Sequence, residues 1–134
     1  MLDEERAALS KARLEHANEC LAAAKQLSAV GNYRSAANRA YYSAFHAMRA
    51  VLAFDDIDMK KHSGIISEFR RLYIKTGLFD AELSNIISAL FDLRTDSDYD
   101  DFFVISKAEV IQQIEDAEHF VGVITEYLTQ KKYN

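Results

Sequence analysis

The sequence predicts an all-α fold: an antiparallel up-and-down helical bundle of four long helices plus one short helix. The chain of 134 residues has no proline and only four glycines, so it offers little material for hairpin turns or flexible linkers. Apolar residues recur at the helical spacing of three and four along most of the chain. The segments between these stripes are short, as is usual between antiparallel neighbours in a bundle.

The first two long helices are predicted over residues 2–30 and 33–54. Gly31 supplies a left-handed stop for the first helix, and Asn32 can cap the second. The second helix contains good helix formers throughout and no breaker. The apolar stripe of the first helix consists of Leu9, Leu14, Ala17, Leu21, Ala24 and Leu27.

The remaining three helices follow an acidic link that contains Asp55, Asp56 and Asp58. A short helix is predicted over 62–75 and ends at Gly77, and a long one is capped by Asp80 and reaches residue 98. The sequence "SKAE" at 106–109 predicts a capping box at the start of the last helix. One face of that helix carries Val110, Ile114, Ala117, Val121, Ile124 and Leu128.

Composition indicates a single globular domain over residues 1–134, since 49% of the residues are hydrophobic and 28% are charged. The only cysteine, Cys20, rules out an internal disulfide framework and fits a reducing compartment, and we interpret it as a small core residue. No stretch approaches the ~20 apolar residues of a membrane span. The N-terminal segment lacks the apolar core of a signal peptide, so we expect a cytoplasmic protein that does not contact membranes.

The net charge of −5 means that the molecule as a whole does not attract nucleic acid. The basic residues are nevertheless concentrated in two segments, and the acidic ones in the links around 55–58 and 92–101. Either these charged residues simply lie on solvent-exposed faces of their helices, or the basic ones form a local basic surface. The basic residues are Arg34, Arg39 and Arg49 in one segment, and Lys60, Lys61, Arg70, Arg71 and Lys75 in the next.

Arg94 occupies a position where a core residue is expected. Three apolar residues form a line on one helical face, and extending this line by four residues reaches Arg94, then Asp98. A buried arginine needs partners. We therefore expect Arg94 at the inner edge of its helix, held by Asp98 or by Asn38 and Tyr42. The apolar line consists of Leu83, Ile87 and Leu90.

The helix predicted over 33–54 carries a polar and aromatic stripe, flanked by Arg39 and His46. On a helical wheel the members of the stripe lie within about 60° of one another. Each residue alone has a structural explanation, as a core aromatic, a satisfied amide or a histidine at the helix edge. Together with Arg94 they indicate a binding site at the interface of a homodimer, because the stripe is too polar for a sealed core and too aromatic for open water. Its members are Asn38, Tyr42, Phe45 and Arg49.

The sequence predicts no metal and no cofactor. His16, His46, His62 and His119 show no pairing at metal-ligand spacing, and one cysteine cannot build a zinc site. The acidic run at 96–101 lacks the glycine of a calcium loop. A glycine-rich phosphate loop is also absent from the sequence.

Four motifs in this order resemble the HEPN domain family: "NRAYYSAFHAMRAVL", "KKHSGIISEF", "YIKTG" and "LRTDSDYDDF". The resemblance covers about residues 5–128 and is closest to the small stand-alone HEPN proteins of bacteria and archaea. It implies a compact antiparallel helical bundle that commonly forms a homodimer. It also implies a partner, since such proteins often accompany a minimal nucleotidyltransferase and many of these pairs act as toxin and antitoxin.

Active members of that family are metal-independent ribonucleases whose motif is an arginine followed, after four to six residues, by a histidine. Arg94 matches the arginine, but Tyr99 stands at the histidine position. Arginine suits phosphate contacts, whereas tyrosine, with a pKa near 10, is a poor base at pH 7. Asp98 or His46 would then have to stand in for the histidine. The resemblance also implies that a tyrosine near this motif is modified by the partner enzyme.

Two functions of different classes follow. In the first, the protein is the RNase-type toxin of a toxin–antitoxin pair, with Arg94 holding phosphate and Tyr99, Asp98 or His46 assisting. Asn38, Arg39, Tyr42 and Arg49 would then bind RNA or a nucleotide. In the second, the protein is a non-catalytic HEPN dimer that binds a nucleotide or a nucleotidyltransferase partner.

Overall fold

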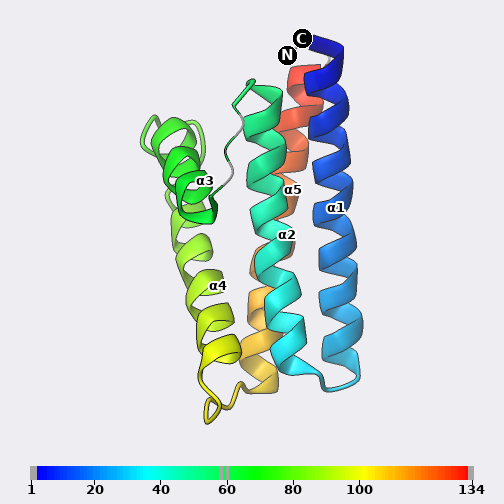
Figure 1. Cartoon of the computed structure of the whole chain (residues 1–134), viewed down its shortest axis with the longest axis vertical. Helices are drawn as coiled ribbons and strands as arrows, with labels where there is room; N and C mark the ends of the chain where they lie inside the picture. The colour runs from blue at the N-terminus through cyan, green and yellow to red at the C-terminus, as the bar shows by residue number, and fades with distance from the viewer. Residues whose placement is uncertain (1–2, 58, 60, 133–134) are drawn as a thin grey trace.

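The computed structural model describes residues 3–57, 59 and 61–132, and these residues form helices joined by turns and short loops, without strands. The predicted all-α bundle of four long helices and one short helix is confirmed (Figure 1). The elements are α1 (Asp3–Ala29), α2 (Tyr33–Phe54), α3 (His62–Phe69), the π-helical turn η1 (Arg70–Ile74), α4 (Glu82–Tyr99) and α5 (Lys107–Lys132).

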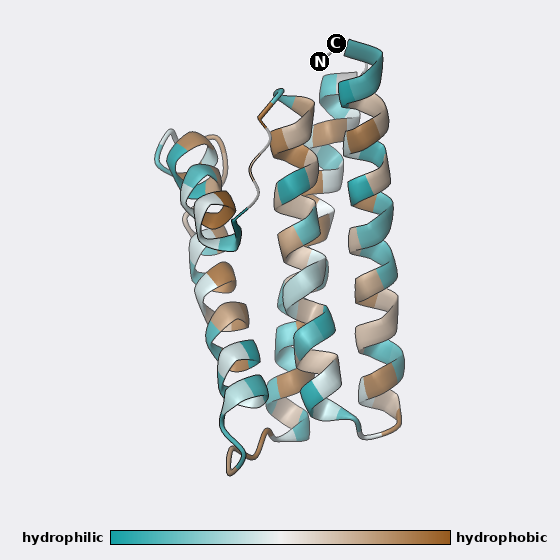
Figure 2. Ribbon diagram, in the orientation of Figure 1, coloured by the Kyte–Doolittle hydropathy of each residue, from teal (hydrophilic) through white to brown (hydrophobic). Residues whose placement is uncertain are grey.

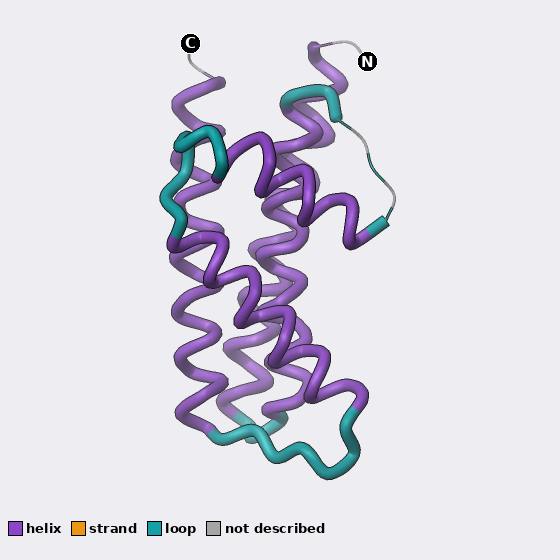
Figure 3. Tube along the Cα trace, turned by 90° about the vertical axis from the view of Figure 1, so that its left-hand side faces the viewer, coloured by secondary structure: helices purple, strands orange, loops and turns teal. Residues whose placement is uncertain are grey.

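Helix α2 lies at the centre of the bundle and packs against α1, α4 and α5 (Figure 1). The four long helices alternate in direction, so that α1 begins and α5 ends at the same end of the bundle. The short helix α3 lies beside the start of α4 at that end, and α4 runs obliquely across the other long helices (Figure 3). This arrangement covers one face of α2 with both α3 and α4.

The core is built from the stripes that the sequence predicted. All six residues predicted for the apolar face of α5 are buried, as are Leu83, Ile87 and Leu90 of α4. Alanines at 36, 40, 44 and 47 are buried on α2, where small side chains allow the neighbouring helix backbones to approach closely. Ser10 of α1 donates a buried hydrogen bond of 2.8 Å to the carbonyl of Ala50, which joins α1 to α2.

Most of the predicted helix ends are confirmed. Gly31 and Gly77 adopt the left-handed conformation, with φ of 84° and 79°, and end α1 and η1. Asp80 accepts a hydrogen bond of 2.9 Å from the amide of Glu82 at the start of α4. Ser106 Oγ accepts a hydrogen bond of 3.1 Å from the amide of Glu109, as a capping box requires.

The cap predicted for α2 is wrong. Asn32 precedes α2 but its side chain makes no capping hydrogen bond. The backbone of Asn32 has ψ of 69°, outside the extended region from which a capping side chain reaches the first turn. The tight three-residue connection from α1 fixes this conformation, since the Asn32 amide donates to the Leu27 carbonyl at 2.8 Å.

The helix predicted over 62–75 is present but changes its winding at Arg70. The amide of Lys75 donates to the carbonyl of Arg70 at 2.9 Å, five residues back, as in a π-helix. The guanidinium of Arg70 donates to Ser84 Oγ at 3.0 Å and to Ser88 Oγ at 2.6 Å, which ties η1 to α4. Three residues named in the sequence predictions, Leu2, Asp58 and Lys60, lie outside the described residues.

The loop between α4 and α5 exposes apolar side chains. Phe102 is 93% exposed and Val104 is 85% exposed, and the loop is coloured as hydrophobic in Figure 2. Tyr99, at the end of α4, is 74% exposed. Within the described residues, none of the helices combines the length and the apolar character that crossing a membrane demands.

Candidate functional site

Arg94 lies at the inner edge of α4, one turn beyond the buried residues of the apolar line. Its side chain is only 17% exposed, and its neighbours come from α2 and from its own helix. Because the line of Leu83, Ile87 and Leu90 faces the core, the helical repeat directs Arg94 toward α2 as well. The guanidinium therefore sits at the rim of the α2–α4 contact, neither sealed in the core nor free in solvent.

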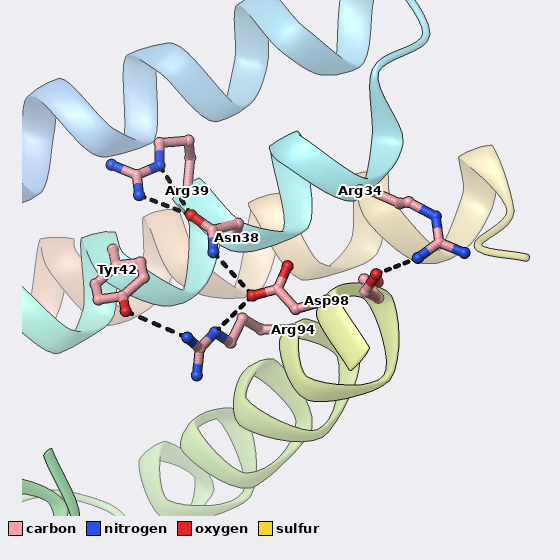
Figure 4. Close-up of polar contacts among 7 residues, drawn as sticks. Arg34, Asn38, Arg39, Tyr42, Arg94 and Asp98 are labelled. Atoms are coloured by element: carbon pink, nitrogen blue, oxygen red, sulfur yellow. Dashed lines mark hydrogen bonds and ion pairs between the residues drawn. The ribbon is translucent and has the colours of Figure 1, made fainter. Parts of the chain in front are cut away.

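Two side chains hold the Arg94 guanidinium in place (Figure 4). Its Nε forms an ion pair of 3.0 Å with Asp98 Oδ2, one turn further along α4. Its Nη2 donates a hydrogen bond of 3.4 Å to Tyr42 Oη on α2. One contact is thus local and the other crosses between helices, so the side chain is positioned by both.

Asn38 extends this network to a second arginine. Its Nδ2 donates to Asp98 Oδ2 at 3.2 Å, so one carboxylate oxygen joins Arg94 and Asn38. Its Oδ1 accepts from both Nε and Nη2 of Arg39, at 3.1 and 2.7 Å. The result is a continuous polar chain that runs from α4 to the side of α2 that faces α1 (Figure 4).

Aromatic rings surround the two guanidinium groups. The Arg94 guanidinium carbon lies 5.4 Å from the ring centre of Tyr41, 5.5 Å from that of Tyr42 and 5.8 Å from that of Tyr99. The Arg39 guanidinium lies 5.1 Å from the Tyr42 ring. These distances are typical of cation–π contacts. Tyr42 therefore lies between two positive charges and hydrogen-bonds one of them.

Arg34 fixes the end of α4 beside this network. Its guanidinium donates hydrogen bonds to the main-chain carbonyls of Ser97 and Phe103, and a longer one of 3.2 Å to that of Asp100. Carbonyl groups at a helix C-terminus carry partial negative charge, which a guanidinium stabilises. Arg34 thereby ties the loop after α4 to the first turn of α2 (Figure 4).

Two residues predicted for the site lie further from Arg94 along α2. His46 is 9% exposed, and its ring stacks on that of His16 of α1, with ring centres 4.0 Å apart. Burial, with nearby positive charges, lowers the pKa of His46 to about 4, so its imidazole is neutral at pH 7. The charge of Arg49 contributes to lowering the pKa of His46 and also that of His62.

His62, at the first turn of α3, is a site residue that the sequence analysis missed. Its ring packs on Phe45, with centres 4.1 Å apart, and meets the edge of Tyr42 at 5.7 Å. Burial and the positive charge of Arg94 lower the pKa of His62 below its usual value. The motif "KKHSG" was visible in the sequence, but only the packing of α3 on α2 brings its histidine beside Tyr42.

The polar stripe of α2 is covered within this chain. Phe45 is buried and Tyr42 is partly buried, because His62 of α3 and Arg94 of α4 lie against them. Asn38, Tyr42 and Arg49 nevertheless stay partly exposed, and the homodimer remains a prediction. Exposed apolar side chains on α4 and the loop that follows it include Phe91, which contacts the Tyr41 ring, and Tyr99, Phe102 and Val104.

Sequence comparisons relate this chain to known proteins. A family model described as the HEPN domain matches residues 10–127. The chain is 33% identical over 116 residues to a protein of Thermotoga maritima named "UPF0332 protein", covering 87% of this chain and 88% of the relative. It is 36% identical over 121 residues to "Putative toxin MJ0605" of Methanocaldococcus jannaschii, covering 90% and 89%. It is 33% identical over 118 residues to "Putative toxin MJ0142" of the same organism, covering 88% and 80%.

Proposed function

The chain belongs to the HEPN family, and we propose that it is the toxin component of a toxin–antitoxin pair and cleaves RNA. The main support for this proposal is the position of Arg94. Its guanidinium lies at the rim of the contact between α2 and α4, where Asp98 and Tyr42 hold it in place. Two relatives whose names describe them as toxins support it at the level of the family. The proposal also requires a group that can take a proton at neutral pH.

The proposed reaction is transfer within the RNA backbone. The 2′-oxygen of a ribose attacks the adjacent phosphorus, the bond to the 5′-oxygen of the next nucleotide breaks, and a 2′,3′-cyclic phosphate and a 5′-hydroxyl form. The 2′-proton passes to a base, and solvent supplies a proton to the leaving oxygen. The free donors of Arg94 would stabilise the negative charge that develops on the phosphate oxygens.

We assign the base to His62 rather than to the residues first considered. Asp98 Oδ2 already accepts from two side chains, and its role is to orient Arg94. His46 is stacked against α1 and nearly buried. His62 is exposed at the start of α3 and its ring contacts that of Tyr42, and its lowered pKa leaves it neutral and able to accept a proton at pH 7.

Tyr99 has a different proposed role. Its ring is close to Arg94, while the side chain is 74% exposed at the end of α4. A minimal nucleotidyltransferase partner could therefore reach the hydroxyl: the Tyr99 oxygen would attack the α-phosphorus of a nucleoside triphosphate, its proton would pass to the partner enzyme or to solvent, and pyrophosphate would leave. Such a group beside Arg94 would block the phosphate site. Where a nucleotidyltransferase gene lies next to this one, co-expression of the two should raise the mass of the chain by one nucleotidyl group, and Tyr99→Phe should prevent the increase.

A second candidate function is a non-catalytic module that binds a nucleotide or a nucleotidyltransferase. The observation in its favour is that Tyr99 stands where active relatives have a histidine. In this case the same network would hold a nucleotide phosphate without cutting a chain. The absence of a nucleotidyltransferase gene next to this one would favour the module over the pair.

The proposed function is tested with purified protein and a labelled single-stranded RNA in the presence of EDTA. The proposal predicts cleavage that leaves a 2′,3′-cyclic phosphate, and no cleavage at a nucleotide replaced by its 2′-deoxy counterpart. Cleavage of the deoxy substrate would contradict the mechanism. Nucleotide binding by calorimetry without any cleavage would support the second candidate.

A further inference from the structure

Three side chains with metal-ligand chemistry meet between α1 and α2, on the far side of Arg39 from Arg94. They are His16 and Cys20 of α1 and His46 of α2. Each offers one ligand atom, and these atoms all lie within 4.8 Å of one another. His16 and Cys20 are four residues apart and so share one face of α1, while His46 faces them from the neighbouring helix.

His46 has a ring nitrogen that is available to bind a metal ion in this cluster. The residue is 9% exposed, and its Nδ1 is a buried atom without a hydrogen-bond partner among the described residues. Buried polar atoms are normally hydrogen-bonded, so an unpartnered nitrogen calls for an explanation.

Cys20 completes a mixed nitrogen and sulfur donor set. Its thiol is buried, and Arg39 Nη1 lies 3.8 Å from its Sγ. Burial raises the pKa of the Cys20 thiol, and the Arg39 charge acts in the opposite direction. A metal ion would remove the thiol proton on binding, and Arg39 would stabilise the resulting thiolate through its hydrogen bond.

We propose that His16, Cys20 and His46 form a binding site for a thiophilic transition-metal ion, Zn²⁺ or Cu⁺. Thiolate and imidazole ligands select these two ions, whereas Mg²⁺ and Ca²⁺ require oxygen ligands. Three protein ligands leave a fourth position for solvent in a tetrahedral site. Tetrahedral zinc with normal bond lengths would need ligand separations of about 3.3–3.6 Å, so the cluster would have to contract by about 1 Å. The exposed His16 side chain would make that adjustment by rotating its ring out of the stack on His46, so that one nitrogen of each ring points toward the ion.

The surrounding charges decide between the two ions. Arg39 and Arg49 both place positive charge near His46, while Glu19 adds a negative charge near Cys20. One thiolate cancels the whole charge of Cu⁺ but leaves Zn²⁺ with a net charge of +1. The two nearby arginines repel that remaining positive charge. The site would therefore favour Cu⁺ under reducing conditions and bind Zn²⁺ more weakly than a site without these arginines.

Co²⁺ is the first probe, because cobalt bound to a thiolate absorbs in the near ultraviolet. The chain contains a single cysteine, so this band on the unmodified protein assigns Cys20 as a ligand. The proposal predicts the band at one equivalent of Co²⁺, its loss on adding one equivalent of Zn²⁺, and competition with a Cu⁺ chelator in a reducing buffer. Absence of the thiolate band in the correctly folded protein would overturn the proposal.

Variants test His16 and Cys20 as ligands. His16→Gln and Cys20→Ser should each weaken Zn²⁺ binding by at least about 10-fold, measured by competition with a chromophoric chelator. Loss of a residue that only hydrogen-bonds a metal ligand typically costs about 10-fold or more, so loss of a ligand should cost at least as much. His119→Gln, a histidine on α5 away from the cluster, is the matched control and should bind as the wild type does. Melting curves without metal exclude a loss of fold. Equal Zn²⁺ affinity in all four proteins would place the bound metal elsewhere and contradict the site.

Discussion

Asp98 Oδ2 lies 3.0 Å from Arg94 Nε and 3.2 Å from Asn38 Nδ2, so a single carboxylate oxygen connects the two helices that build the site. Arg94 and Asp98 are one turn apart on α4, and Asn38 reaches them from α2. The carboxylate uses the Nε side of the guanidinium, and Tyr42 contacts only one of the terminal nitrogens. The remaining N–H groups are the ones that a phosphate could reach.

Replacing Asp98 by asparagine tests whether this carboxylate orients Arg94. Asp98→Asn keeps the shape but removes the ion pair, so the free energy of unfolding should fall by only about 1 kcal/mol. RNA should bind more tightly because a negative charge beside the phosphate is lost, while the rate of cleavage falls because Arg94 is less well positioned. Anisotropy with labelled RNA and single-turnover cleavage measure the two quantities. Weaker binding together with slower cleavage would mean that Asp98 contributes in another way.

His62→Gln tests the assignment of the base. Cleavage should fall by about 100-fold or more, because general bases contribute 10²–10⁴-fold. RNA affinity should stay within about threefold, as the phosphate contact belongs to Arg94. His119→Gln serves as the control. Unchanged cleavage by His62→Gln would exclude His62 and return attention to His46 and Asp98.

The pH dependence of cleavage follows from the same residue. The pKa of His62 is lowered by burial and by the positive charges of Arg94 and Arg49. More than half of the base is therefore neutral at pH 6.5, so the midpoint of the rise in rate should lie below the usual histidine pKa of about 6.5 and the rate should be level above neutral pH. A rate that still rises steeply above pH 8 would instead indicate a tyrosine or lysine as the base.

Much of this site could be predicted from the sequence because it depends on periodicity within one helix. The apolar line of α4 leads to Arg94 and Asp98 by steps of four, and the stripe of α2 gives Asn38 and Tyr42. The positions of His62 beside Tyr42 and of His16 beside His46 depend on how one helix packs on another. A single sequence does not show which residues of two helices lie side by side. The spacing of His16 and Cys20 by four residues was the one signal available, and without His46 it did not suggest a metal site.

The predicted homodimer has a second candidate surface besides the α2 stripe. Because α3 and α4 cover part of that stripe, we expect the interface to include the exposed apolar residues Tyr99, Phe102 and Val104. Light scattering at micromolar concentration should show a dimer, and Phe102→Ser combined with Val104→Ser should shift it toward monomer. A wild-type protein that remains monomeric at these concentrations would rule out the homodimer.

Tyr73 provides a test of the fold that is separate from the site. Its buried hydroxyl donates a hydrogen bond to Asp55, linking η1 to the end of α2. Burial and this hydrogen bond raise the pKa of Tyr73 well above its usual value of about 10. As the pH rises, Tyr73 therefore loses its proton at a higher pH in the folded state than in the unfolded state. Its contribution to the free energy of unfolding is fully present below pH 10 and falls above pH 10 by up to about 1.4 kcal/mol per pH unit.

Tyr73→Phe should lower the free energy of unfolding at pH 7 by about 1–2 kcal/mol and flatten its decline above pH 10. Tyr127→Phe removes a hydroxyl from a neighbouring ring of the same aromatic cluster and is the control. Denaturant unfolding at pH 7 and at pH 10.5 provides both values. An equal decline in wild type and Tyr73→Phe would show that another group titrates.

Arg94 is proposed to bind the phosphate of the RNA backbone. The most direct test compares RNA cleavage and thermal melting in two variants, Arg94→Ala and Arg71→Ala. Arg71 is an exposed arginine paired with Glu68, so its removal subtracts the same charge away from the site. The account predicts that Arg94→Ala loses cleavage by about 100-fold or more, as expected when a transition-state donor is removed, and melts within a few degrees of the wild type. Arg94→Lys should recover part of the activity, since it restores the charge without the guanidinium fork. Arg94→Ala with unchanged cleavage and a loss of stability of about 3–5 kcal/mol would contradict the account and make Arg94 a structural residue.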